Sequence, residues 1–187
     1  MEIRLSFGML ALLAGVLWGL TPRAPRASLN PHGEQAVELS ALEDAFAVRR
    51  GDVVLARRLA ATYLRLDQPA LAIGVVRAVS PSLVVDPLLT HHLAQAYEAV
   101  GHLDDALATA SVAHARCLRA LGSAEAAAMV GTTRFTCSPA ALVALEQHEA
   151  ALAQMIAWGV SDPRHDPRAG IARGISQRRA RIASIAE

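Results

Sequence analysis

The chain has 187 residues, enough for one modest domain, and 53% of them are hydrophobic while only 4% are aromatic. An alanine-rich, aromatic-poor composition of this kind favours packed helices over sheets, so we predict an all-α fold. The formal net charge of +1 excludes a global attraction to nucleic acid or to acidic surfaces. Any charge-driven binding must therefore come from local patches.

The first predicted element is a membrane-targeting segment within residues 1–22. Residues 5–20 contain only apolar side chains, glycine and Ser6, and a stretch rich in proline and arginine follows. The apolar run is longer than most signal-peptide cores and shorter than a full membrane span. Its flank lacks the small residues of an Ala-x-Ala cleavage site, so we favour an uncleaved anchor over a signal peptide. A buried core helix is a third alternative.

The flanks of the apolar run give opposing indications of its orientation. Arg23 and Arg26 follow it, and positive flanks prefer the cytoplasm, which would keep the next domain inside the cell. An apolar run at the extreme N-terminus instead acts most often as an export signal. We predict an inner-membrane anchor in a bacterial cell envelope, with the domain facing the periplasm. No cysteine lies in or just after the run, which excludes a lipoprotein anchor.

After the apolar segment we predict a linker at residues 23–33 and then a helix at residues 34–52. The linker is marked by the Pro31-His32-Gly33 stretch. The helix carries apolar residues that include Leu39, Leu42 and Phe46. We expect this helix to cover the open end of a helical array, because a short array exposes apolar surface at both of its ends.

Six residue types recur 34 positions further along the chain. The first set is Asp52, Leu55, Leu59, Ala60, Tyr63 and Ala72, and the second is Asp86, Leu89, Leu93, Ala94, Tyr97 and Ala106. The leucines and the tyrosine in each set are four residues apart and form one apolar stripe of a helix. The aspartates can cap the first turn of that helix, and the alanines allow a second helix to approach closely.

This spacing resembles the tetratricopeptide repeat (TPR) family, in which helical hairpins of 34 residues stack on one another. The resemblance assigns two repeats to residues 53–120 and implies a short right-handed solenoid that serves as a binding scaffold. It implies neither catalysis nor a cofactor. The first copy departs from the second at the turn, where Asp67-Gln68-Pro69 replaces the glycine found at Gly101.

Residues 121–187 form a C-terminal helical region that we expect to cover the other end of the array. A helix over residues 140–158 ends at Gly159, and a final helix over residues 168–186 forms a hairpin with it. The final helix has arginines on one side and Ile171, Ile175, Ile182 and Ile185 near one face. We favour packing of this face against the preceding helix over binding to an anionic membrane or to an acidic partner.

The exposed side of the two first helices is the predicted docking surface for a protein or peptide partner, since the resemblance places these helices on a concave face. Two arginines can pair with carboxylates, and three apolar residues can hold apolar anchors of the partner. The predicted partner-binding residues are Val54, Arg57, Leu64, Arg65, Leu88, His91, Gln95 and Glu98. Packing against the N-terminal cover helix, or plain solvation, is the alternative.

The two cysteines, Cys117 and Cys137, flank the connection between the repeats and the C-terminal region. In an oxidising compartment they can form a disulfide, and two separate buried thiols are the alternative. His114 lies one helical turn from Cys117, but no further cluster completes a metal site, so we predict no metal. No phosphate-binding loop, nucleophile elbow or HExxH motif is present, so we predict neither catalytic residues nor an enzyme.

The leading hypothesis is therefore a scaffold tethered to the membrane through residues 5–20 that mediates protein–protein interaction in the cell envelope. A second hypothesis is a small-ligand-binding or enzyme-accessory domain with a pocket between the repeats and the C-terminal helices. A third is a structural module for oligomerisation. The three hypotheses differ in whether the molecule offers an open groove, a deep polar pocket or exposed apolar ends.

Overall fold

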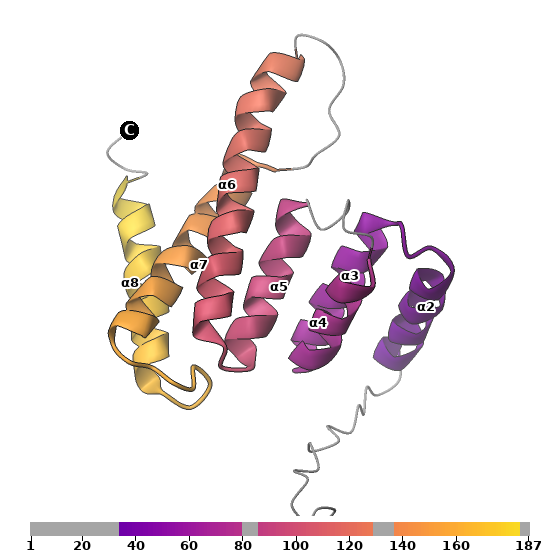
Figure 1. The fold of residues 1–187 in the computed structure, drawn as a ribbon, viewed down its shortest axis with the longest axis horizontal. Coiled ribbons are helices and arrows are strands. Elements are labelled where there is room, and N and C mark those ends of the chain that lie inside the picture. Colours follow the sequence, from indigo (N-terminus) through magenta and orange to yellow (C-terminus); the bar gives the residue numbers. More distant parts are fainter. Residues whose placement is uncertain (1–33, 80–85, 129–136, 184–187) are drawn as a thin grey trace, which may run out of the picture. The chain divides into compact units, whose positions relative to one another are not determined.

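The computed structural model describes residues 34–79, 86–128 and 137–183. The chain divides into two units, Met1–Asn30 and Pro31–Glu187, and every described residue lies in the second. All regular elements in this part of the chain are α-helices, which confirms the predicted all-α fold. They are α2 (Glu34–Val48), α3 (Val53–Arg65), α4 (Pro69–Ala78), α5 (Pro87–Ala99), α6 (Leu103–Ala128), α7 (Pro139–Ala157) and α8 (Pro167–Ala183) (Figure 1).

The helices α3 and α5 begin at positions 34 residues apart and end at positions 34 residues apart. Their N-caps match as well, because Asp52 accepts a hydrogen bond from the backbone N–H of Leu55 at 3.2 Å and Asp86 accepts one from Leu89 at 2.8 Å. These carboxylates satisfy backbone donors that have no partner within the helix. The sequence period therefore corresponds to a period in the positions and caps of the helices.

The turns that follow α3 and α5 share one backbone conformation. Asp67 has a φ of 56° and Gly101 has a φ of 82°, so both residues are left-handed. In each turn the next residue donates its N–H back to a tyrosine carbonyl, from Gln68 to Tyr63 at 2.8 Å and from His102 to Tyr97 at 2.9 Å. This bonding closes the end of a helix. The first turn thus keeps its geometry although an aspartate replaces the glycine.

Alanines make the close contacts between neighbouring helices. Ala60 and Ala72 are fully buried in the first hairpin, and Ala94 and Ala106 are fully buried in the second. Small side chains at these positions let the paired helices approach closely, and larger leucine and valine side chains fill the space on either side. The first core also includes Leu39, Leu42 and Phe46 of α2, which packs against α3.

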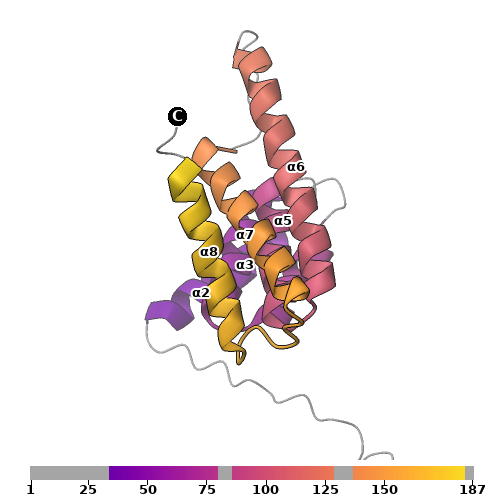
Figure 2. The ribbon, with the colours of Figure 1, turned by 90° about the vertical axis from the view of Figure 1, so that its left-hand side faces the viewer.

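The C-terminal half continues the succession of antiparallel helices. Helix α6 runs to Ala128, beyond the boundary at residue 120 that the sequence predicts, and packs against α5 and α7. Helices α7 and α8 lie side by side (Figures 1 and 2). The inner face of α8 carries the buried Ala169 and Ala172, while Ile171 is 54% exposed. Helix α8 is therefore packed against the preceding helix, as we favoured, with Ala169 and Ala172 buried, whereas Ile171 of the predicted face is exposed.

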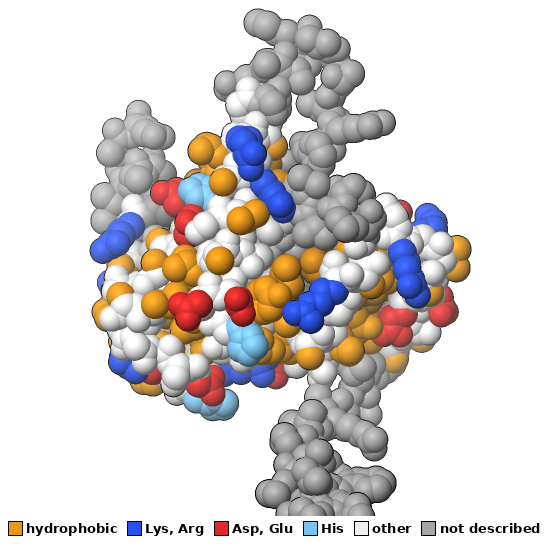
Figure 3. Space-filling view, in the orientation of Figure 1, with side chains coloured by type: hydrophobic (Ala, Val, Ile, Leu, Met, Phe, Trp, Pro, Cys, Tyr) orange, Lys and Arg blue, Asp and Glu red, His pale blue; other side chains and the backbone are white. Residues whose placement is uncertain are grey.

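No helix within residues 34–79, 86–128 and 137–183 is long and apolar enough to cross a membrane. The predicted membrane-targeting segment at residues 5–20 and the linker at residues 23–33 lie outside the described residues. On the face shown in Figure 3, arginine and acidic side chains are spread in small groups among apolar ones.

Candidate binding groove

A groove of about 880 Å³ runs between the first helices of the two hairpins and the C-terminal hairpin. Three elements form it: helix α3, helix α5, and the segment that comprises the α7–α8 connection and α8. The residues that line the groove are Ala61, Leu64, Arg65 and Asp67 from α3 and its turn, His92, Gln95, Glu98 and Ala99 from α5, and Pro163, Arg164, His165 and Arg173 from the C-terminal segment.

Helical spacing explains why these side chains share the groove. Ala61, Leu64 and Arg65 are three and four residues apart along α3, so they project from one face of the helix. His92, Gln95 and Ala99 repeat this spacing along α5. The opposite face of α3 bears buried core residues. The apolar part of the groove comes mainly from alanine and Leu64, and the polar part comes from the helix ends and α8.

An ion pair closes one side of the groove. The guanidinium of Arg164 in the α7–α8 connection lies 2.9 Å from a carboxylate oxygen of Asp67 in the α3–α4 turn. The Asp67 side chain is 78% exposed, so water screens this pair and its contribution to stability is small. The pair therefore restrains the connection beside the groove without fixing it firmly.

Glu98 joins three helices at the inner wall of the groove. Its Oε2 lies 2.9 Å from Nε2 of His148 on α7, and its Oε1 accepts from the guanidinium of Arg173 on α8 at 2.6 and 3.2 Å. The Glu98 residue is only 9% exposed. Burial acts to raise the pKa of this carboxyl, but the bonds from His148 and Arg173 outweigh it and lower the pKa. Glu98 is therefore an ionised, fully engaged carboxylate.

A second cavity of about 280 Å³ lies on the other side of Glu98 and Arg173. His91 lines it, and its Nδ1 lies 3.3 Å from Nδ1 of His148. Burial lowers the pKa of His91 to about 3, with a smaller contribution from the neighbouring His148. His91 is therefore a neutral imidazole at physiological pH. The other lining residues are mainly amides, a serine and alanines: Gln95, Gln147, Gln177, Ser176, Ala144 and Ala151.

The structure brings half of the predicted partner-binding residues together. Leu64, Arg65, Gln95 and Glu98 line the groove. His91 lines the second cavity, which shares Gln95 and Glu98 with the groove.

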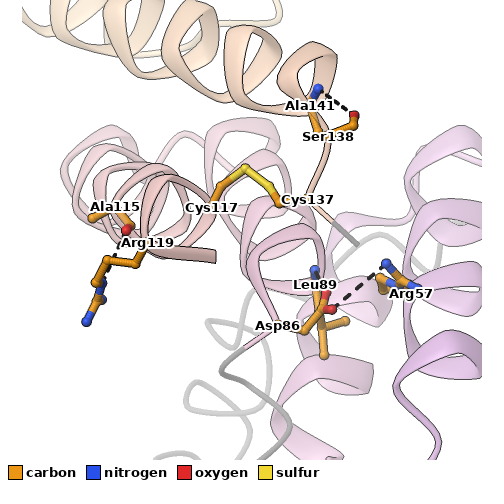
Figure 4. Close-up of a disulfide and its surroundings, with 9 residues drawn as sticks. All are labelled: Arg57, Asp86, Leu89, Ala115, Cys117, Arg119, Cys137, Ser138 and Ala141. Carbon is orange, nitrogen blue, oxygen red and sulfur yellow. Dashed lines mark hydrogen bonds and ion pairs between the residues drawn. A yellow bond between two sulfur atoms is a disulfide. The ribbon is translucent and has the colours of Figure 1, made fainter. Parts of the chain in front are cut away.

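The other three predicted residues line neither cavity. Val54 is 51% exposed on α3, and Leu88 is half-buried at the start of α5. The guanidinium of Arg57 lies 3.9 Å from the buried carboxylate of Asp86, so this arginine is engaged within the protein (Figure 4).

Several groove residues escaped the sequence analysis because they come from distant parts of the chain. Arg164 and His165 belong to a connection that has no periodic pattern, and Arg173 looked like one more surface arginine of a basic helix. Asp67 could have been found, since it takes the place of a turn glycine.

His92 is turned toward Gln95, with Nδ1 at 3.0 Å from the amide oxygen, and burial lowers the pKa of His92.

Cys117 and Cys137 form a disulfide in the structure (Figure 4). Their Cα atoms are 5.5 Å apart, within the usual range for such a bond. Cys117 is fully buried on α6, and Cys137 lies just before Ser138, whose hydroxyl caps α7. The bond therefore fixes the start of α7 against α6. Among the described residues, no group of histidine, cysteine and acidic side chains is arranged to hold a metal ion.

Comparisons with protein-family models, with curated proteins and with solved structures gave no match to this chain.

Proposed function

We propose that this chain is a membrane-tethered, TPR-like scaffold of the bacterial cell envelope that binds a segment of a partner protein in the groove. The observation that carries the proposal is the composition of the groove: an apolar strip formed by Ala61, Leu64 and Ala99, bordered by charged side chains. Extended and helical peptides bind to surfaces of this kind, where apolar anchors supply affinity and polar groups at the edge set orientation.

The matching helix ends of α3 and α5 support the TPR-like part of the proposal. Two stacked hairpins leave apolar faces at both ends, and α2 and the C-terminal hairpin pack at these positions. The groove lies where the first helices of the two hairpins meet α8. The membrane tether rests on the apolar character of residues 5–20.

The second cavity favours the alternative of a small-ligand-binding domain, because His91, His148, Glu98 and Arg173 converge on it. We give this alternative second place, because three of these four groups are paired with one another and are not directed to a ligand. A structural oligomerisation module is a further alternative, because Val37 and Val48 on α2 are exposed apolar side chains that a second copy could cover. Sedimentation of the full chain in detergent tests it, since a monomer at every concentration would rule it out.

A pair of tryptophan substitutions tests the groove. Ala61→Trp places an indole in the groove, whereas Ala108→Trp places the same side chain on an exposed position of α6 outside it. Proteins that copurify with the full chain from native membranes are compared for both variants, after thermal unfolding has shown that each is folded. We expect Ala61→Trp to lose partners that Ala108→Trp retains. If both variants recover the same partners in the same amounts, the groove is not the docking site.

A further inference from the structure

We propose that the groove selects an acidic segment of the partner, with a carboxylate side chain placed against Arg65. This inference rests on the proposed docking function and assigns the chemistry of the ligand. It follows from the charges that converge on the groove and from the partners that these charges already have.

Three guanidinium groups from three elements reach the groove. Arg65 comes from the end of α3, Arg164 from the α7–α8 connection and Arg173 from α8. Asp67 and Glu98 are the carboxylates among the lining residues. The three guanidinium groups outnumber the two carboxylates by one, so these side chains give the groove a net positive charge that a ligand carboxylate can neutralise.

The two carboxylates of the groove are already engaged. Glu98 is paired with Arg173 and His148: one of its carboxylate oxygens accepts from the guanidinium of Arg173, and the other lies beside the imidazole of His148. Asp67 is paired with Arg164. A basic ligand would therefore meet the positive charge of Arg65 and no carboxylate that lacks a partner, which disfavours it.

Arg65 is the arginine that remains available to an acidic ligand. Its guanidinium donates to the hydroxyl of Thr62 at 3.0 Å, and within the described part of the chain no carboxylate lies within ion-pair distance of it. Arg65 is exposed, so its remaining donors face water. A planar guanidinium with free donors binds a carboxylate through two parallel hydrogen bonds.

The apolar strip next to Arg65 defines the rest of the ligand. Leu64 precedes Arg65 in the chain, and Ala61 lies one helical turn earlier on the same face. A partner segment that places an aspartate or glutamate against Arg65 can therefore lay an apolar side chain on Leu64 and Ala61. The expected ligand is a short segment in which acidic and apolar residues are close neighbours.

Selection from a library of random twelve-residue peptides tests this inference. The peptides are displayed with both ends fused to the carrier, so that an acidic preference reports side chains and not a terminal carboxylate. The target is the full chain in mild detergent. Bound peptides are then measured against Arg65→Glu, against the milder Arg65→Gln, and against Arg58→Glu. Arg58 is the matched control, because it is exposed on α3, pairs with Glu38 and does not line the groove.

We expect the selected peptides to be enriched in aspartate and glutamate next to apolar residues. Arg65→Glu should weaken their binding at least tenfold, Arg65→Gln should weaken it less, and Arg58→Glu should leave it within twofold. Suppose that Ala61→Trp abolishes peptide binding, but that the selected peptides lack acidic enrichment or bind Arg65→Glu as well as the unaltered chain. That result would overturn the inference and leave the docking function standing. Peptides that bind Ala61→Trp undiminished would count against both proposals.

Discussion

Asp67 and Gly101 lie 34 residues apart and have the same left-handed backbone, with φ angles of 56° and 82°. They end the first helix of each hairpin and turn the chain into the second. Left-handed backbone is unstrained for glycine and costs about 1 kcal/mol or more for most other residues. Aspartate is among the side chains that tolerate it best, which explains how the first hairpin forms without a glycine.

Gly101→Ala should lower the free energy of unfolding by about 1–2 kcal/mol. An added Cβ would be strained by the positive φ and would also lie 3.3 Å from the carbonyl oxygen of Ser161. Gly74→Ala is the control, because Gly74 is inside α4 and a Cβ there meets no atom within 4 Å. It should raise stability by about 0.5–1 kcal/mol. Urea unfolding of both variants checks the prediction, and equal midpoints would contradict it.

Glu98→Gln should destabilise the folded chain by about 1–3 kcal/mol, because it removes one charge of a largely buried network and leaves Arg173 and His148 without their shared partner. The loss stays below that of a fully buried pair, since the Arg173 side chain is 45% exposed. Glu38→Gln, which alters the exposed pair with Arg58, should change stability by less than about 0.5 kcal/mol. Denaturant unfolding that ranks the two variants equally would argue against a joining role for Glu98.

Acid should destabilise this protein below about pH 6.5, because burial lowers the pKa values of His91 and His92 in the folded state. Between pH 6.5 and 3 the unfolded chain binds a proton at His91 that the folded chain does not, so stability falls as the pH falls. Glu98 acts in the same direction at lower pH. Its folded pKa lies below the ordinary value of 4.5, so its contribution is complete above that value and is lost on further acidification.

Replacing His91 tests this pH dependence. His91→Gln should reduce the slope of unfolding free energy against pH, between pH 6 and 4, by up to about 1.4 kcal/mol per unit. His165→Gln is the control, since the His165 side chain is 82% exposed beside Asp162. If the slopes of the unaltered chain and of His91→Gln are the same, His91 is not held neutral by burial.

Loss of the disulfide should lower stability by about 3 kcal/mol, since the bond between Cys117 and Cys137 closes a loop across a sequence separation of 20 residues. The double variant Cys117→Ser, Cys137→Ser is compared with the oxidised chain by urea unfolding. Reduction of the unaltered chain should bring its midpoint close to that of the double variant. Alkylation of two free thiols in the denatured, non-reduced chain would show instead that the bond does not form.

Local patterns in the sequence were sufficient to predict most of the helices. The four-residue spacing of Leu55, Leu59 and Tyr63, together with the capping aspartate Asp52, placed α3 correctly because these signals act within one or two helical turns. The later copy placed α5 for the same reason. The end of α6 was missed, since the predicted boundary at residue 120 followed the length of the repeat, whereas the helix continues through Gly122 to Ala128.

The groove was only partly predictable, because its walls meet through tertiary packing. The first-helix residues Leu64, Arg65, Gln95 and Glu98 followed from helical periodicity combined with the family resemblance. The opposite wall did not follow, because nothing local to Arg164 or Arg173 indicates that a turn or helix 70 to 100 residues away accepts their charges. Glu98 illustrates the difference: its position on α5 was predictable, but its bonds to α7 and α8 were not.

We propose that the groove between the first helices and the C-terminal hairpin is the docking surface. Site-specific photo-crosslinking in living cells tests it most directly, with the photoreactive residue placed in turn at Ala61, Gln95 and Ala99 in the groove and at Ala108, Val112 and Ala115 on α6. We predict that the three groove positions crosslink to a common protein and that the α6 positions do not. Crosslinks to that protein from α6 alone, or none from the groove, would show that the groove is not the docking surface.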